Sequence, residues 1–394
     1  MSGSLNNIYN NVSFALRLHT KEMTQLQEQV STGSRINRVS DDSIAAYQIL
    51  GLNTQQSTLG NYIDNLSEVS DTLQLSSTII QDMVSVISEV RTRIAQISSG
   101  VYTDDSRQRT ADGIDELLEQ IVTLANTKHM GQYIFGGGST TSQPYQVTRT
   151  DGEITSVTYQ GSYENRSIEV APSLKSSALL VGEEVFKSND RGELIFVGDT
   201  GAKAGTGTSS VCNDTWLTVT GSSGNYTISI DGGLTTFNTD GTDTNLAVTS
   251  SVTGEVLYID TTEIAGPGVD LVRAPGTYDI FNTLINIREI LKNENGLSHA
   301  QLMELQEGIV DSLQEMNDLL LQTEVMVGTK AGFLDGLKGN LNDLKYDNED
   351  EKTRLEEADI AQIAIDLSRR EVLYEMSLSI AGKLMSMSLL DFLS

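Results

Sequence analysis

The sequence predicts a mainly α-helical protein with an inserted β domain, in which N- and C-terminal helices pair into a coiled-coil or helical-bundle rod and an antiparallel β domain projects outward. Both flanks carry apolar residues at alternating steps of three and four, the spacing of helices that pack on other helices. All four prolines and most of the 34 glycines lie between Gly131 and Gly276. Helix interiors exclude proline, so the helical pattern stops in this middle segment.

A first helix is predicted near the N-terminus, followed by a break and a second start. Thr32-Gly33-Ser34 is a helix stop signal. Ser40-Asp41-Asp42 predicts the next start, with a capping serine and two acids suited to the positive end of a helix. The first helix has its mainly apolar positions at helical spacing: Leu5, Ile8, Val12, Leu16, His19, Met23, Leu26 and Val30.

The second helix is predicted to be long and to reach about Gly100. Ser76 is the one polar step in its ladder, and the residues between are mostly polar or charged, so it is not a membrane span. Thr103-Asp104-Asp105 then predicts a shorter helix. The ladder consists of Leu59, Tyr62, Leu66, Val69, Leu73, Ser76, Ile80, Met83, Ile87, Val90, Ile94 and Ile97.

From residue 139 the pattern changes to short alternating runs rich in threonine, valine and isoleucine, which predict an antiparallel β domain. Asp231-Gly232-Gly233 and Asp240-Gly241 are its turn candidates. Gly136-Gly137-Gly138 lacks the spacing and the lysine of a phosphate-binding loop, and is interpreted as a hinge between helix and β domain. The expected strands are Glu153–Tyr159, Ser167–Val170, Glu193–Val197, Trp216–Thr220, Tyr226–Ile230 and Glu255–Ile259.

Helices are expected to return after the last proline. One is predicted over Phe281–Asn293 and ended by Gly296, and Ser298 with Gln301 fits a capping box that opens the next. An acidic segment, Asp347–Glu351, is expected to separate that helix from a final one. The apolar positions of the final helix are Ile360, Ile363, Leu367, Tyr374, Leu378, Ala381, Met385 and Phe392.

The two terminal arms are predicted to hold the surface on which the protein assembles. Each is a short helix with an apolar stripe and little nearby to cover it, and isolated short helices are marginal in water. We therefore expect residues of about 1–40 and 355–394 to be mobile in the monomer and to order when buried between subunits.

The composition disfavours most kinds of binding and catalysis. The 394 residues have a formal charge of −28, which opposes nucleic-acid and membrane-surface binding. Cys212 is the single cysteine and none of the three histidines has a second ligand at metal-site spacing, so no disulfide, metal, cofactor or catalytic site is predicted. Residues 240–245 offer oxygen atoms but lack the order of a calcium loop. Without a secretory signal or a membrane span, the residues alone indicate a cytoplasmic protein.

Ordered motifs stand at both ends of the chain. The segments are Leu26–Asp42, Leu124–Thr127, Gly131–Gly137 and Ser388–Leu393. On these residues the chain resembles the flagellin superfamily, and the Asn-Arg-x-Ser-Asp-Asp form with the Ser-Leu-Leu-Asp-Phe-Leu ending is similar to its hook–filament junction proteins. Ser43 departs from the proline that the family often has there. The polar motif residues are Arg35, Asn37, Arg38, Ser40, Asp41 and Asp42, interpreted either as a loop of ion pairs or as a subunit contact.

The resemblance implies a structural subunit of the bacterial flagellum, not an enzyme, that forms the junction between hook and filament. The implied partners are hook-associated protein 1, flagellin and an export chaperone, with self-association in a ring. Export through the flagellar type III apparatus would replace the cytoplasmic location by a secreted, extracellular one. The alternatives are a filament flagellin and, more distantly, a secreted glycan-binding protein that acts through the β domain.

The resemblance also implies three parts. Residues 1–43 and 351–394 would form a terminal coiled coil, 44–138 and 277–350 an α-helical rod domain, and 139–276 a β-rich outer domain. The expected assembly stripe consists of Leu5, Ile8, Val12, Leu16, Leu378, Ala381, Met385 and Phe392.

Overall fold

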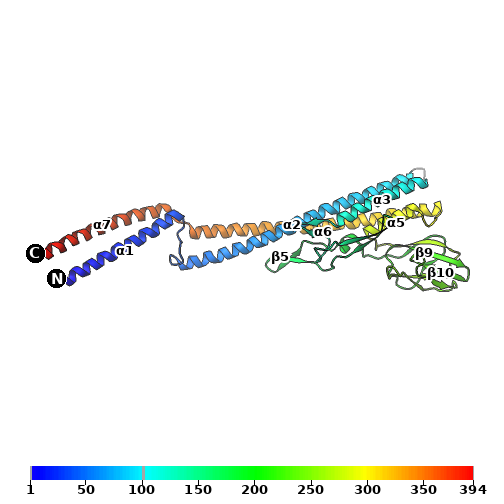
Figure 1. Ribbon diagram of the computed structural model, residues 1–394, viewed down its shortest axis with the longest axis horizontal. Helices are drawn as coiled ribbons and strands as arrows, with labels where there is room; N and C mark the ends of the chain where they lie inside the picture. Colours follow the sequence, from blue (N-terminus) through cyan, green and yellow to red (C-terminus); the bar gives the residue numbers. More distant parts are fainter. Residues whose placement is uncertain (1, 100–102, 394) are drawn as a thin grey trace. The chain divides into compact units, whose positions relative to one another are not determined.

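The computed structural model describes residues 2–99 and 103–393, and the chain divides into two compact units (Figure 1). We call Met1–Asp64 with Leu337–Ser394 the terminal unit, and Asn65–Gly336 the central unit. Two long helices each contribute residues to both units. This division differs in position from the three parts implied by the resemblance, whose functional boundaries stay a prediction.

The helices follow most of the predicted starts. Thr103 caps α3, because its side chain accepts a hydrogen bond from the Ser106 N–H. The Ser298 capping box is present, since the N–H of Ser298 donates to Gln301 Oε1 at 2.8 Å. Asn293, in the left-handed conformation, ends α5 before Gly296 is reached. The helices are α1 (Ser2–Thr32), α2 (Ser43–Ser99), α3 (Asp104–Ala125), α4 (Gly182–Phe186), α5 (Ile280–Lys292), α6 (His299–Glu356) and α7 (Ile360–Leu393).

The acidic segment does not interrupt the helix, so that prediction was wrong. α6 continues through Asp347–Glu351 to Glu356. Most of these acids face solvent, glutamate is a good helix former, and Asp350 pairs with Arg354 one turn later at 2.8 Å. The break comes at Ala358, which is buried, and Asp359 then caps α7 by accepting the Gln362 N–H at 3.0 Å.

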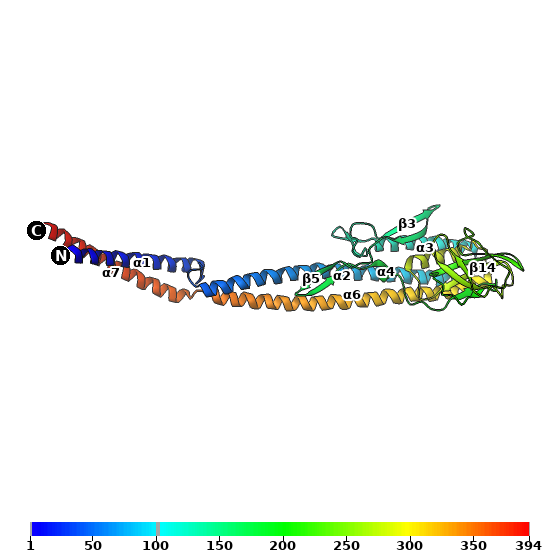
Figure 2. The same ribbon diagram turned by 90° about the horizontal axis from the view of Figure 1, so that it is seen from below.

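In the central unit, α2 and α6 run antiparallel with a constant register (Figure 1, Figure 2). Three hydrogen bonds join their side chains: Ser70 to Asp335 at 2.8 Å, Gln81 to Glu324 at 2.6 Å, and Arg91 to Gln314 at 3.0 Å. Each step up α2 is therefore matched by an equal step down α6. The predicted ladder is buried here, and the one polar step is satisfied because Ser76 Oγ donates to the Thr72 carbonyl.

Other elements cover this helix pair. Asn65 on α2 donates to the Glu169 carbonyl of β5 at 2.8 Å, and Lys330 on α6 donates to the Ser177 carbonyl of β6 at 2.7 Å. α3 packs on α5, where the buried Arg288 guanidinium pairs with Asp115. Three two-stranded hairpins lie in this part of the chain: β1 (Lys128–His129) with β2 (Gln132–Tyr133), β3 (Tyr145–Thr150) with β4 (Glu153–Tyr159), and β5 (Ser167–Ala171) with β6 (Leu174–Ser177).

A β sandwich forms separately from these hairpins, so the segment predicted as one β-rich domain contains several independent sheets. Its core includes Leu217, Val219, Ile228, Val248 and Leu257. The five-stranded antiparallel sheet has the order β11 (Phe237–Thr239), β10 (Asn225–Ser229), β9 (Asn213–Ser222), β14 (Gly268–Ala274) and β7 (Ile195–Val197). The three-stranded sheet has the order β12 (Leu246–Thr249), β13 (Val256–Asp260) and β8 (Lys203–Ala204).

The glycine triplet is not a hinge, contrary to the prediction. The Gly137 N–H donates to the Leu180 carbonyl at 3.1 Å, and the Gly138 N–H donates to the Glu164 carbonyl at 2.6 Å. Gly137 has φ +58°, and a Cβ there would lie 2.1 Å from the Ser162 carbonyl oxygen. Glycine is therefore required at position 137, because the backbone at Ser162 passes too close to leave room for a Cβ.

Candidate assembly interface

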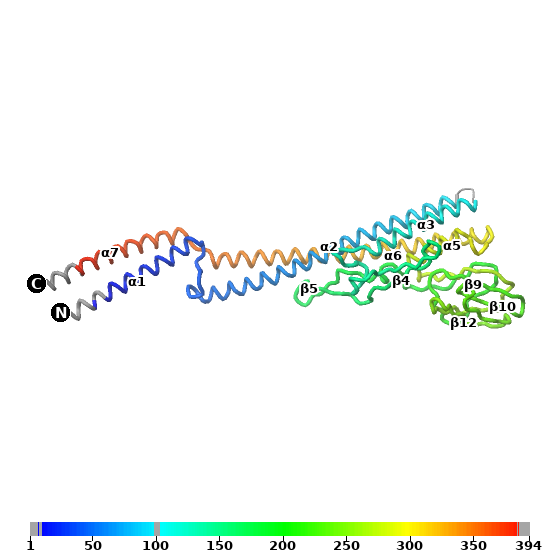
Figure 3. Tube along the Cα trace, in the orientation of Figure 1, coloured from blue at the N-terminus to red at the C-terminus, as the bar shows by residue number. Residues whose placement is uncertain are grey.

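In the terminal unit, the loop between α1 and α2 is bonded to the connection between α6 and α7 (Figure 3). The Arg35 N–H donates to the Glu356 carbonyl at 2.7 Å, and the Ala358 N–H donates to the Gly33 carbonyl at 3.1 Å. The Arg35 guanidinium also donates to the Leu355 carbonyl at 3.2 Å. Two connections more than 300 residues apart in sequence are thus joined through their backbones.

Two aspartates organise the loop itself. One carboxylate oxygen of Asp41 accepts the N–H groups of Asn37 at 3.1 Å and Arg38 at 2.9 Å. Asp42 accepts the Ala45 N–H at 3.0 Å and pairs with Arg35 at 3.2 Å. The Ala45 hydrogen bond, followed by the Arg35 hydrogen bond, lowers the pKa of Asp42. Asp42 is therefore a negatively charged cap of α2.

The predicted motif residues play different parts in this arrangement. Arg35, Asn37, Asp41 and Asp42 fold the loop, whereas Arg38 reaches back to Glu28 on α1 at 3.0 Å. Ser40, predicted as the capping residue, lies in an exposed turn before the helix, and Asp42 takes that role. Asp42 is adjacent to the helix start, which allows its side chain to reach the first free N–H groups. These contacts lie within one chain, and a subunit contact through the same residues stays a prediction.

α1 and α7 form an antiparallel pair in the terminal unit. Arg370 pairs with Glu22 at 2.5 Å, which fixes their register. Counting ten residues along each antiparallel helix from this ion pair places Val12 level with Ile380. The seam consists of half-buried or buried residues at helical spacing: Val12, Leu16, His19, Met23 and Leu26 on α1, with Ile363, Leu367, Tyr374 and Ala381 on α7.

The predicted assembly stripe is divided by this seam. Val12, Leu16 and Ala381 lie along it and are partly covered within the chain. Leu378 and Met385 instead remain 46% and 57% exposed. The side chains of Leu5, Ile8 and Phe392 lie outside the described residues.

Sequence reasoning missed a second apolar face on α7. Ile365, Val372, Met376 and Ile380 project from one side of the helix at steps of seven, four and four, and all are exposed. On α1, Phe14 and Leu18 are exposed opposite the seam. A helix that packs on one other helix needs only one apolar stripe, so a second stripe indicates a further contact. Counting all apolar positions on α7 could therefore have identified this face.

The described residues provide little for catalysis or metal binding. They contain no group of three or more His, Cys, Asp or Glu residues arranged to hold a metal ion. The Asp240 carboxylate accepts both the N–H and the hydroxyl of Thr242, so it is engaged in its own turn. No described helix combines the length and apolarity that crossing a bilayer requires.

The known proteins that this chain resembles are flagellar. Residues 4–140 match the bacterial flagellin N-terminal helical region. Flagellar hook-associated protein 3 of Escherichia coli is 29% identical over 168 residues, 42% of this chain and 51% of that protein. Flagellin B of Helicobacter pylori is 23% identical over 159 residues, 40% of this chain and 28% of that protein. The alignment therefore spans only about half the length of the Escherichia coli relative.

A solved structure agrees in fold. The crystal structure of flagellar hook associated protein-3 from Legionella pneumophila has a TM-score of 0.54 at 17% identity, and the match covers 78% of this chain and 98% of that one. Long terminal helices around an antiparallel β region are thus shared between the two proteins. Residues 4–140 therefore match a flagellin helical region, and the chain is similar in sequence and fold to flagellar hook-associated protein 3.

Proposed function

We propose that this protein is a structural subunit of the bacterial flagellum that forms the junction between hook and filament and has no enzymatic activity. The exposed apolar residues on both outer faces of the α1–α7 pair are the main support. Among the described residues of the terminal unit, the buried apolar side chains are few: Ala45, Leu59, Leu341, Ala358 and Ile363. The pair covers one seam and leaves two faces for other subunits.

The energetics favour assembly through these faces. Burying one large apolar side chain stabilises a contact by about 1.5 to 3 kcal/mol. α7 alone exposes Ile365, Val372, Met376 and Ile380 on one face, enough to offset part of the cost of ordering a helix against a neighbour. We infer that the α7 face of one copy packs on the α1 face of the next; such a head-to-tail contact closes into a ring or continues as a helix.

The proposed partners follow from the resemblance. Hook-associated protein 1 would lie on the hook side, flagellin on the filament side, and other copies of this chain around the ring. A dedicated chaperone would cover the apolar arms before export, which matches their exposure in the single chain. The assembled protein would be extracellular, at the flagellum.

The test is deletion of the gene followed by complementation. Cells without the gene are expected to carry bare hooks and to release flagellin into the medium, as seen by electron microscopy and immunoblotting. The wild-type gene should restore filaments, and the variant V372D with M376D should not. Its matched control is L234D with V252D, which places the same charges on exposed aliphatic positions of the sandwich. Filaments on cells with the α7 variant would contradict the proposal.

A filament flagellin is the second candidate, because Flagellin B aligns with a similar share of this chain. A flagellin elongates on its own polymer, whereas a junction subunit stops after its own layer. Purified protein added to short fragments of filaments sheared from the same bacteria distinguishes the two. Growth into long filaments would favour flagellin, and its absence alongside bare hooks in the deletion strain would favour the junction.

A further inference from the structure

A solvent-accessible cavity of about 220 Å³ lies in the central unit. Its walls come from the β3–β4 hairpin, the short helix α4 and the start of α5. Four aromatic rings pack in sequence around it: Tyr145 lies 4.6 Å from Phe281 and 5.2 Å from Tyr159, and Tyr159 lies 5.5 Å from Tyr163 between ring centroids. These rings form a rigid wall that ends at the surface.

Tyr163 is the open end of this wall. Its side chain is 68% exposed and meets Tyr159 edge to face, with an angle of 74° between the rings. The Tyr159 hydroxyl is already bonded to the carbonyls of Phe135 and Ser162, which holds its ring in place. A ligand could therefore lie against Tyr163 without any rearrangement of the wall.

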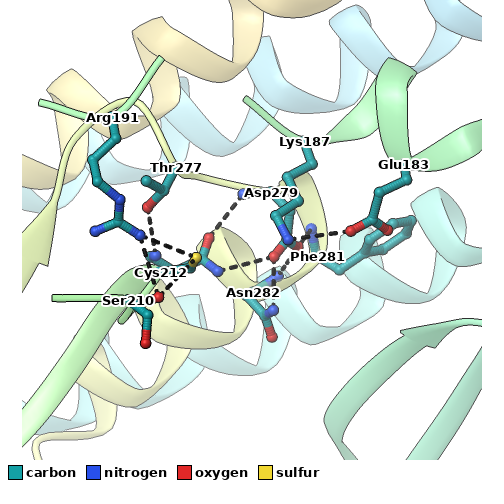
Figure 4. A network of polar contacts seen from close by, with 10 residues as sticks. Glu183, Lys187, Arg191, Ser210, Cys212, Thr277, Asp279, Phe281 and Asn282 are labelled. Atoms are coloured by element: carbon teal, nitrogen blue, oxygen red, sulfur yellow. Dashed lines mark hydrogen bonds and ion pairs between the residues drawn. The ribbon is translucent and has the colours of Figure 1, made fainter. Parts of the chain in front are cut away.

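The polar side of the cavity pairs a donor with an acceptor. Lys187 Nζ donates to Glu183 Oε1 at 3.1 Å, and both side chains are partly exposed (Figure 4). An ammonium has three donors and a carboxylate only acceptors, so the pair keeps capacity of both kinds. Asn282 adds an amide whose nitrogen is bound to Asp279, leaving its oxygen without a donor among the described residues.

The lining combines the Lys187 ammonium with the carboxylates of Glu183 and Asp279, so it disfavours anions and offers hydrogen-bond donors and acceptors to a neutral ligand. Neighbouring hydroxyls on one ring match the lining better, because one hydroxyl can donate to Glu183 while the next accepts from Lys187. The C–H face of such a ring can cover an aromatic side chain, which combines the two walls.

We propose that this cavity binds a neutral hexose unit of a glycan, stacked on Tyr163 and hydrogen-bonded to the Glu183–Lys187 pair. The cavity holds one sugar ring, and longer chains would extend into solvent past Tyr163. Binding here is separate from the assembly function proposed above, because none of the lining residues lies on α1 or α7.

The experiment is saturation-transfer difference NMR on the full-length monomer with glucose, galactose, mannose and N-acetylglucosamine, each to concentrations on the order of tens of millimolar. Choline and acetate are the charged comparison ligands. We expect transfer to at least one sugar, strongest at the protons of one ring face. Transfer to none of the four, or to choline or acetate alone, overturns the proposal.

Two variants locate the binding. Tyr163→Ala should weaken sugar binding about tenfold, while Tyr163→Phe, which keeps the ring, should stay close to wild type. Tyr346→Ala is the matched control, since Tyr346 is 69% exposed on α6 in the terminal unit. Glu183→Gln removes the charge while retaining the shape and should also weaken binding. Equal binding by wild type and Tyr163→Ala, with both proteins folded by circular dichroism, would place the sugar elsewhere and contradict the proposal.

Discussion

The two antiparallel helix pairs of this protein use the same apolar spacing with different results. Between α2 and α6, the central-unit ladder is buried and three side-chain hydrogen bonds keep one register. Between α1 and α7, most seam residues are only half-buried. The difference lies in what covers each pair: hairpin β5–β6 bonds to both helices of the first, while the described chain adds no such layer to the second. A heptad pattern therefore specifies a helix contact, and neighbouring elements decide whether it becomes a core.

The largest effect should come from the buried charges of the central unit. Arg273 donates to Asp214 at 3.2 Å, to the Tyr278 hydroxyl at 2.9 Å and to the Gly308 carbonyl of α6 at 2.7 Å, and both charged side chains are under one tenth exposed. Arg273→Ala leaves Asp214 buried without its cation, and should destabilise the protein by about 3 to 5 kcal/mol in urea unfolding.

The corresponding change in the terminal unit is Arg35→Ala. Its pair with Asp42 is 47% and 33% exposed and therefore screened by solvent, so the loss should be much smaller than in Arg273→Ala. Equal losses of unfolding free energy in Arg273→Ala and Arg35→Ala would show that burial of an ion pair does not set its contribution to stability in this protein.

The next effect compares apolar residues of the same type. Leu73 is fully buried in α2. Leu73→Ala should lower the unfolding free energy by about 3 kcal/mol, because the truncation leaves a cavity among packed side chains. Leu378→Ala, at a 46% exposed position of α7, should change the unfolding free energy by about 0.5 kcal/mol or less. A large loss in Leu378→Ala would mean that the α1–α7 pair already has a core in the single chain.

The sequence predicted the helices well where local signals and packing agree. The capping residues Thr103 and Ser298 and the Leu66–Ile94 ladder are in the predicted roles. Strands β4 and β10 were found from alternation, but β14 was not, although it is an inner strand of the five-stranded sheet. Its run of buried residues on both faces, including Asp270 and Arg273, has no alternation to detect.

The errors share a cause, which is that long-range contacts are invisible in local patterns. The glycine triplet was interpreted as flexible because its contacts with Ser162 and Leu180 come from distant residues. The end of α6 was predicted at the charged segment Asp347–Glu351. The helix instead ends at Glu356, just before Ala358, whose N–H is bonded to the Gly33 carbonyl. The sugar-sized cavity also combines residues 145–163 with Glu183 and Asn282, which no single segment contains.

A pH effect tests the turns of the sandwich. Burial pushes the pKa of Asp231 upward, but the N–H groups of Thr235 and Ser251 and the hydroxyls of Ser251 and Ser229 outweigh it and hold the pKa well below its usual range. A depressed pKa stabilises the folded state above the unfolded value of about 4, and that contribution is lost as the pH falls through the folded pKa.

As the pH falls below about 4, the turns held by Asp231 should therefore progressively lose protection. Hydrogen exchange at the amides of Thr235 and Ser251 measures this loss. In Asp231→Asn the same amides should exchange quickly at neutral pH, with little further change on acidification. Unchanged protection in that variant would contradict the assignment of Asp231 as the link between the two turns.

The smallest effect tests which residue begins α2. Asp42 accepts the Ala45 N–H, so Asp42→Ala removes this cap and should increase exchange at the first amides of α2. Ser40→Ala is the matched control and should have no measurable effect, because Ser40 lies in the preceding turn. The ion pair with Arg35 is also lost in Asp42→Ala, so Arg35→Ala must be measured beside it. If Ser40→Ala loosened the start of α2 and Asp42→Ala did not, serine capping as the sequence predicts it would be right and the cap assigned from the structure wrong.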